Sequence, residues 1–134
     1  MKEAIRVVLV DDQELYREGN ALLLDATDDI VVVGEADTGE EALHAIAEAK
    51  PDIVLMDIRM PGMGGIDATR RIVSAHPDIR VIALTIFDLD EYAFGALDAG
   101  ASAFILKSSS PEALIRTVRI VASGEAVVEP RITR

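Results

Sequence analysis

The segment IVLMDIRMPGMGGID, residues 53–67, carries the strongest structural signal in this sequence. It opens with an unbroken apolar run, Ile53–Met56, and such a run is typical of a strand that is buried on both faces. Asp57 follows the run directly, and the turn-forming residues Met60–Gly62 come next. A helical pattern begins at Ile66. The segment therefore predicts a strand, a carboxylate at its end, and a connection to a helix.

Similar apolar runs lie on both sides of this segment. Most of them are continuous rather than alternating, and they are rich in Val and Ile, as expected for strands covered on both faces. The five predicted strands are Ile5–Val10, Ile30–Val33, Ile53–Met56, Val81–Leu84 and Ala103–Leu106.

The stretches between these runs have the period of helices. Thr38 and Glu41 have the spacing of a capping box, and Ser110–Pro111 pairs a capping residue with proline at the first helical position. The predicted helices cover residues 13–26, 38–49, 66–75 and 89–99, with a last one starting at Ser110–Pro111. The period places Leu15, Leu22 and Leu23 on one apolar face of the first helix, and Leu114, Val118 and Val121 on that of the last.

Short strands that alternate with longer helices indicate right-handed βαβ units. We therefore predict an α/β fold in which a doubly wound, five-stranded parallel sheet is covered by helices on both sides. Five such units fill residues 5–123, and residues 124–134, which have no clear period, are expected to begin a linker.

The composition excludes several classes of function. The chain has 134 residues, 13 basic and 24 acidic, for a net charge of −11, so these residues alone are poorly suited to bind nucleic acid. There is no cysteine, which excludes disulfides and thiol catalysis, and the two histidines cannot form a multi-histidine metal centre. We expect no membrane span, no signal peptide and a cytoplasmic location.

The acidity is concentrated in the first half of the chain. Residues 1–67 contain 16 acidic and 5 basic side chains, whereas residues 68–134 contain 8 of each. The excess therefore lies in the half that includes the carboxylates discussed next.

Polar side chains follow four of the five predicted strands. Asp11 and Asp12 follow the first, Asp57 the third, Thr85 the fourth and Lys107 the fifth. Ligands bind beyond the carboxyl ends of the strands in open α/β sheets, so we expect these side chains to converge there. The second strand has no such residue and is expected at the sheet edge.

Each of these residues also has a purely structural interpretation. Asp11 or Asp12 could cap the helix that starts near Gln13, and Asp57 could form a turn. Thr85 could form a local hydrogen bond, and Lys107 could be solvated surface. The coincidence of complementary chemistry at four strand ends favours a site.

The charges of these residues call for a cation. Three adjacent carboxylates repel one another, and one ammonium cannot neutralise them. An oxygen-only site of this kind suits Mg²⁺. Carboxylate, Mg²⁺, hydroxyl and lysine together are the components of a phosphoryl-transfer site with Asp57 as the nucleophile.

Four ordered motifs resemble the receiver domain of two-component response regulators. They are LVDDQ (9–13), IVLMDIRMPGMGGID (53–67), VIALT (81–85) and GASAFILK (100–107). The resemblance implies a flavodoxin-like fold with strand order 2-1-3-4-5 in a receiver domain of residues 1–123. It implies that Asp57 accepts a phosphoryl group from a sensor histidine kinase, and that the chain is a phosphoacceptor rather than an enzyme.

The resemblance also assigns roles to the neighbours of Asp57. Asp12, Asp57 and the backbone carbonyl of Arg59 would bind Mg²⁺, with Asp11 helping through water. Thr85 and Phe104 would form the switch pair, in which Thr85 moves toward the phosphate and the ring turns inward. Arg59 and Phe87 would tune dephosphorylation, and Lys107 would contact the phosphate. Many receivers have a cis proline after the lysine, but here Ser108 occupies that position, so we predict no cis bond.

The last helix and the tail resemble those of NarL/FixJ-type regulators. We therefore expect residues 124–134 to begin a linker to a helix-turn-helix domain beyond this chain, through which alone the protein would contact DNA. We also expect phosphorylation to promote a homodimer, through either the first and last helices or the fourth.

Three other interpretations of the α/β pattern remain open. An aspartate-based phosphatase would have its nucleophile after the first strand, in a DxD pattern. This chain has the sequence Asp11, Asp12, Gln13 there, so its second carboxylate is at the wrong position for that pattern. An FMN-binding module would have a neutral phosphate loop there, and two aspartates would repel a phosphate. A single-domain receiver would act only by protein–protein contact.

Overall fold

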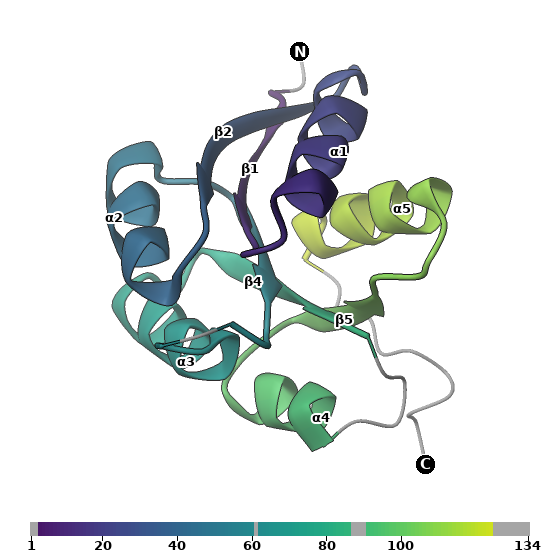
Figure 1. Cartoon of the computed structure of the whole chain (residues 1–134). Coiled ribbons are helices and arrows are strands. Elements are labelled where there is room, and N and C mark those ends of the chain that lie inside the picture. Colours follow the sequence, from purple (N-terminus) through teal and green to yellow (C-terminus); the bar gives the residue numbers. More distant parts are fainter. Residues whose placement is uncertain (1–2, 61, 87–90, 125–134) are drawn as a thin grey trace.

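The computed structural model describes residues 3–60, 62–86 and 91–124, and for residues 91–93 it describes the backbone alone. Five strands alternate with five helices in these residues (Figure 1). In chain order they are β1 (Ile5–Val10), α1 (Glu14–Asp25), β2 (Ile30–Ala36), α2 (Gly39–Ala49), β3 (Ile53–Asp57), α3 (Gly65–Ala75), β4 (Arg80–Thr85), α4 (Glu91–Asp98), β5 (Ala103–Leu106) and α5 (Pro111–Ala122).

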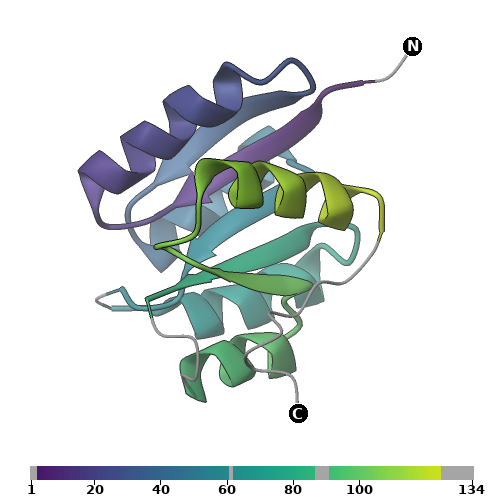
Figure 2. The ribbon, with the colours of Figure 1, turned by 90° about the vertical axis from the view of Figure 1, so that its right-hand side faces the viewer.

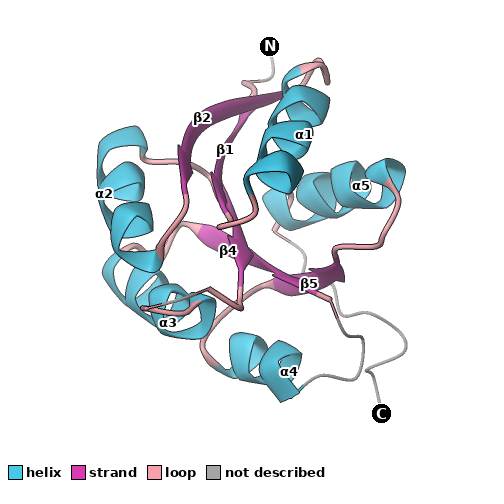
Figure 3. Ribbon diagram, viewed as in Figure 1, coloured by secondary structure: helices cyan, strands magenta, loops and turns pink. Residues whose placement is uncertain are grey.

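The strands form one parallel sheet in the order β2-β1-β3-β4-β5, which confirms the predicted fold class and strand order. Figure 3 shows the strands in magenta with helices around them. β2 lies at one edge, as its lack of a polar closing residue indicated. The chain crosses from the middle of the sheet to one side and then to the other. Ligand sites of open α/β sheets lie beside that reversal, at the carboxyl ends of β1 and β3.

The helices cover both faces of the sheet because successive strand residues point to opposite sides. In β1, Val7 and Leu9 pack in a cluster with residues of α1 and α5, whereas Val8 and Val10 pack with residues of α2 and α3. Figure 1 shows α1 and α5 on one side of the sheet, and Figure 2 turns that side toward the viewer. Each buried Val or Leu contributes roughly 1.5–3 kcal/mol through the hydrophobic effect.

Three strands are longer at their carboxyl ends than predicted, and one of them, β2, continues to Ala36 instead of ending at Val33. β3 includes Asp57 and β4 includes Thr85, although both residues were expected to follow their strands. The parallel pairing continues through them, since Asp57 pairs with Leu84 and Thr85 with Leu106. These two polar side chains therefore project from a rigid sheet rather than from loops.

The apolar face predicted for the first helix is wrong for two of its three leucines, Leu15 and Leu22, and is confirmed for Leu23. Leu15 and Leu22 of α1 are 87% and 76% exposed, whereas Leu24 is fully buried. Leu24 belongs to the hydrophobic cluster between the sheet and helices α1 and α5. Three partly buried residues of α1 also pack on this cluster, namely Tyr16, Ala21 and Leu23. The period defines the possible faces of a helix, but the direction in which α1 leaves β1 decides which face meets the sheet.

The remaining helices follow the predicted pattern closely. Thr38 and Ser110 are the N-caps of α2 and α5, and each accepts a hydrogen bond from the backbone three residues on. Leu114, Val118 and Val121 of α5 are buried, as predicted. No peptide bond among the described residues is cis, in agreement with the prediction at Ser108.

Some predictions concern residues outside the described part of the chain. These are the start of the fourth helix at Leu89, the rate-tuning residue Phe87, and the linker after Gly124. None of the helices in the described ranges is both long and apolar enough to cross a membrane.

Candidate functional site

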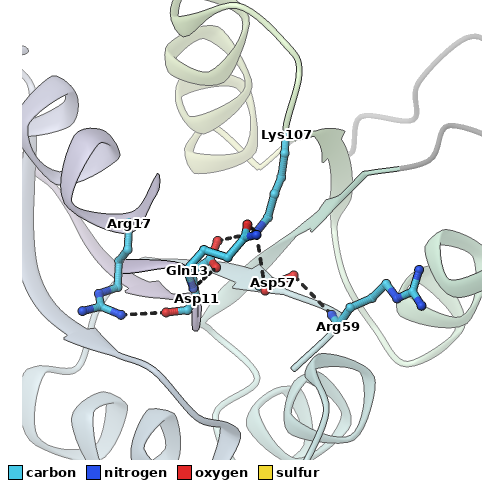
Figure 4. Close-up of polar contacts among 6 residues, drawn as sticks. All are labelled: Asp11, Gln13, Arg17, Asp57, Arg59 and Lys107. Atoms are coloured by element: carbon cyan, nitrogen blue, oxygen red, sulfur yellow. Dashed lines mark hydrogen bonds and ion pairs between the residues drawn. The ribbon is translucent and has the colours of Figure 1, made fainter. Parts of the chain in front are cut away.

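Five predicted site residues lie together at the carboxyl ends of β1, β3, β4 and β5. Figure 4 shows Lys107 reaching across from the end of β5 toward Asp11 and Asp57. A cavity of about 170 Å³ opens here, and its lining residues are Asp12, Gln13, Asp57, Arg59, Thr85, Ile86 and Lys107. The sheet therefore brings together side chains that are up to 96 residues apart in sequence.

Three carboxylates form the acidic part of the site. One oxygen from each of Asp11, Asp12 and Asp57 lies within 4.8 Å of the other two. Asp11 and Asp57 are 2% and 4% exposed, and Asp12 is exposed to solvent. Buried carboxylates this close repel one another strongly, because little water screens their charge.

The local turns orient these carboxylates. Oδ1 of Asp11 accepts a hydrogen bond from the backbone N–H of Gln13 at 2.8 Å, and Oδ1 of Asp57 accepts one from Arg59 at 3.2 Å. In both cases the aspartate carboxylate accepts from the backbone N–H two positions further along the chain. The N-cap of α1 is Gln13, and α1 has no side-chain cap. The interpretation of Asp11 or Asp12 as a helix cap is therefore wrong.

Lys107 supplies the positive charge of the site. Its Nζ lies 2.8 Å from Oδ2 of Asp11 and 3.5 Å from Oδ2 of Asp57. It also donates a hydrogen bond to Oε1 of Gln13 at 2.7 Å and lies 4.7 Å from the centre of the Tyr16 ring. One ammonium against three carboxylates leaves a net negative charge.

The surroundings of Asp57 change the pKa of its carboxyl group. The pKa of its carboxyl is raised from the ordinary value of 3.8 to about 7, mainly by burial and in addition by the charge of Asp11 and a hydrogen bond with Asp12. Lys107 and the Arg59 N–H act in the opposite direction on this pKa. The single lysine is too little to keep Asp57 ionised well below neutral pH.

The residues fit a divalent cation. Oδ2 of Asp11 is buried and forms an ion pair with Nζ of Lys107 at 2.8 Å, and apart from this pair it has no hydrogen-bond partner among the described residues. Together with the other two carboxylates it forms a set of hard oxygen ligands, which Mg²⁺ prefers. The geometry thus supports the predicted magnesium site, with Asp11, Asp12 and Asp57 as its carboxylates.

Gly65 allows α3 to begin directly against β3. A Cβ atom at this position would lie 2.2 Å from the carbonyl oxygen of Asp57 and 2.5 Å from Cα of Ile58. Both distances are far below van der Waals contact. A side chain at position 65 would displace the backbone of Asp57 and Ile58, and glycine avoids this.

The predicted switch and rate-tuning residues lie around this centre. Thr85 is buried at the end of β4, and Phe104 of β5 is 1% exposed, with its ring packed in the cluster on the α2–α3 side. The ring thus occupies the inward position in this structure. Arg59 is exposed, and its guanidinium points away from the carboxylates (Figure 4).

Sequence reasoning missed three contributors from α1 and the residue before it. Gln13 and Tyr16 contact Lys107, as described above, and Arg17 donates a hydrogen bond to the backbone carbonyl of Asp11 at 2.7 Å. Burial raises the pKa of the Tyr16 hydroxyl, so the ring stays neutral beside the lysine. Tyr16 and Arg17 follow Gln13 by three and four positions, so the three side chains lie on one face of the helix. This spacing could have identified them from the sequence.

Comparison with known proteins gives matches over most of the chain. A model of the response regulator receiver domain matches residues 7–119. The response regulator GacA of Pseudomonas viridiflava is 42% identical over 130 residues, which are 97% of this chain and 61% of GacA. The chain thus spans about three fifths of the length of this relative.

Solved structures of high similarity have the same fold. A LuxR-family two-component response regulator from Aurantimonas sp. SI85-9A1 is 36% identical with a TM-score of 0.90, over 97% of this chain and 93% of that one. The signal receiver domain of the response regulator NarL from Mycobacterium tuberculosis is 37% identical with a TM-score of 0.87, over 92% and 99% of the two chains.

Proposed function

The chain belongs to the response regulator receiver domain family, and on this basis we propose that Asp57 accepts a phosphoryl group from a phosphohistidine of a sensor histidine kinase. The observation that carries the proposal is the cluster of Asp11, Asp12 and Asp57 with Lys107 at the carboxyl ends of the strands. Asp57 projects from the central strand β3, and the other two carboxylates and Lys107 lie close to it.

The transfer requires Asp57 in its ionised form. A carboxylate oxygen of Asp57 attacks phosphorus, the P–N bond to the donor imidazole breaks, and the imidazole keeps the electron pair and takes up a proton. Asp11, Asp12, Asp57 and the backbone carbonyl of Arg59 would hold Mg²⁺, which when bound supplies positive charge to the phosphoryl oxygens. The ordinary role of this chain is then that of a phosphoacceptor, not of a turnover enzyme.

Neighbouring side chains complete the site. Lys107 Nζ, 3.5 Å from Asp57, offers a donor to one phosphoryl oxygen, and the Thr85 hydroxyl at the end of β4 offers another. Thr85 and Phe104 form the proposed switch pair, whose two states phosphorylation would shift. Arg59 and Phe87 are proposed to slow the attack of water on the acyl phosphate.

We further propose that the chain is the receiver part of a transcriptional regulator. Its receiver domain would comprise residues 1–123, with residues 124–134 starting a linker to a helix-turn-helix domain. The support is that the chain covers only 61% of GacA and 58% of a Bacillus subtilis transcriptional regulatory protein, YxjL, that is 44% identical. DNA would be bound by that further domain, and the protein would act in the cytoplasm.

Phosphorylation is proposed to change self-association to a homodimer. Leu15 and Leu22 give α1 an exposed apolar stripe, which supports the α1–α5 face, and the α4 face is the alternative. Sedimentation with and without beryllofluoride and Mg²⁺ tests this. An unchanged mass, with no NMR shift near Thr85, contradicts it.

The phosphoacceptor role is tested by mass spectrometry after incubation with acetyl phosphate and Mg²⁺. We expect one added phosphoryl group, lost in Asp57→Asn and with excess EDTA. Asp67→Asn is the matched control, because Asp67 lies only ten residues away but is exposed and pairs with Arg70. An adduct that survives in Asp57→Asn contradicts the proposal, and continuous phosphate-ester turnover in that variant would favour a phosphatase.

A further inference from the structure

Arg17 connects the acidic turn to the edge strand of the sheet. Its Nη1 donates to the carbonyl oxygen of Asp11 at 2.7 Å, while its Nε donates to Oε1 of Glu35, near the end of β2, at 2.9 Å (Figure 4 shows the first contact). The Arg17 side chain is 15% exposed, so this is not a freely solvated surface pair.

The backbone of Asp11 is therefore tethered to the end of β2 on both sides. Its N–H donates directly to the carbonyl of Ala36 at 3.0 Å, and its C=O reaches Glu35 through Arg17. The turn that carries Asp11 and Asp12 contains two of the three clustered carboxylates. Repulsion among the carboxylates, which Lys107 offsets only in part, favours a more open turn, and the backbone hydrogen bonds oppose this.

We infer that Arg17 is a positioning residue for the Asp11–Asp12 turn, and that it preorganises this turn for the divalent cation. The inference rests on the proposed function, because it assumes that the carboxylate cluster binds Mg²⁺. The two hydrogen bonds of Arg17 go to the carbonyl oxygen of Asp11 and to Glu35, and not to the carboxylates of Asp11, Asp12 or Asp57. It acts through the peptide that follows Asp11.

The geometry requires arginine rather than any cation. Guanidinium presents several donors in a fixed plane, so Arg17 bonds the carbonyl of Asp11 and the carboxylate of Glu35 at once. A lysine has a single nitrogen on a flexible stem and would hold one of these partners less rigidly. Glu35 in turn orients Arg17 and neutralises its charge.

The experiment measures the dissociation constant of Mg²⁺ by calorimetry in wild type, Arg17→Ala, Arg17→Lys and Glu35→Gln. Loss of a group that supports a metal ligand typically weakens metal binding about 10- to 100-fold. We expect Arg17→Ala to weaken Mg²⁺ binding about tenfold, with Arg17→Lys and Glu35→Gln weakened less. In the metal-free protein, the Gln13 amide resonance should shift in Arg17→Ala.

Arg119→Ala is the matched control. Arg119 forms a two-pronged pair with Asp29, at 2.9 Å for each contact, but it lies near the end of α5, away from the carboxylates. We expect its loss to leave Mg²⁺ affinity and the Gln13 amide unchanged. If Arg17→Ala does not fold, Arg17→Lys and Glu35→Gln decide the question.

The experiment distinguishes a failure of the role inferred for Arg17 from a failure of the proposed magnesium site. Wild-type affinity for Mg²⁺ in all three site variants, or the same loss in Arg119→Ala, overturns the role of Arg17 and leaves the proposed function standing. A wild-type protein that binds no Mg²⁺ overturns the proposed magnesium site, and the role of Arg17 with it.

Discussion

The ammonium nitrogen of Lys107 lies 2.8 Å from Oδ2 of Asp11, although these residues follow β5 and β1, which have β3 and β4 between them in the sheet. The lysine side chain therefore spans the site and passes Asp57 at 3.5 Å. Both members of the pair are almost fully buried, so little water screens the interaction. This contact links the charges at the ends of β1 and β5 to the carboxylate of Asp57 on the central strand β3.

The first prediction concerns the charge of Asp57. Lys107 favours the ionised carboxylate, so Lys107→Met should raise the pKa of Asp57 further above its value of about 7. Carboxyl-carbon NMR across a pH titration measures this directly. Lys50→Met, at the exposed end of α2, is the control and should leave the titration unchanged. A pKa that falls or stays constant in Lys107→Met contradicts the charge balance described here.

The second prediction concerns stability and pH. The folded-state pKa of Asp57 is about 7 and its ordinary value is 3.8, so between these pH values the folded protein keeps a proton that the unfolded chain releases. The contribution of Asp57 to the free energy of unfolding must therefore decrease as pH rises from about 4 to about 7. Each unit of pKa difference corresponds to about 1.4 kcal/mol.

Asp57→Asn isolates this contribution. The variant should be more stable than wild type at pH 8, by up to a few kcal/mol, and the difference should vanish toward pH 4. Urea unfolding at a series of pH values tests this. Added Mg²⁺ should stabilise wild type more at pH 8 than at pH 5, because protons compete with the ion for the carboxylates. Parallel stability curves for the two proteins would count against the raised pKa.

The third prediction concerns Gly65. Gly65→Ala should destabilise the fold by about 1–3 kcal/mol through overpacking, and it should reduce phosphorylation of Asp57 by displacing the backbone there. Gly19→Ala is the matched control, since Gly19 is exposed within α1 and a Cβ atom would meet nothing within 4 Å. That change should stabilise by roughly 0.5–1 kcal/mol. Equal thermal shifts in both variants would contradict the close approach of α3 to β3.

The fourth prediction compares two leucines of α1. Leu24→Ala should cost about 2–5 kcal/mol, as expected for a buried leucine, whereas Leu22→Ala should change the free energy of unfolding by less than about 0.5 kcal/mol. Leu24 is fully buried and Leu22 is 76% exposed. Denaturant unfolding of the two variants at low protein concentration makes the comparison. A large loss in Leu22→Ala would place the other face of α1 on the sheet.

The fifth prediction concerns Thr69 in α3. Its hydroxyl oxygen is buried and has no hydrogen-bond partner among the described residues. Thr69→Val removes the unsatisfied hydroxyl at nearly constant volume and should stabilise by about 0.5–1.5 kcal/mol. Thr27→Val is the contrasting change, because Thr27 donates to the carbonyl of Leu23 at 3.1 Å and should lose stability. Destabilisation of Thr69→Val in thermal unfolding would indicate an unrecognised partner.

The sequence alone indicated the parallel sheet and the composition of the site, whereas the strand order was implied by the resemblance to receiver domains. Continuous apolar runs such as Ile53–Met56 are typical of strands buried on both faces, and their alternation with helices indicates a parallel sheet covered on both sides. Because parallel strands end on the same edge, Asp57 and Lys107 could be placed together without coordinates. Side-chain chemistry then indicated a cation.

Only the tertiary structure decided which contacts support the site and which helix face is buried. The period of α1 could not show that Leu22 is exposed, because that depends on the direction of the turn after β1. The link from Arg17 to Glu35 and the carbonyl of Asp11 joins α1 to the edge strand β2, and no local pattern specifies such a contact. The physical reason is that strand and helix signals are local, whereas ligand positioning depends on distances across the sheet.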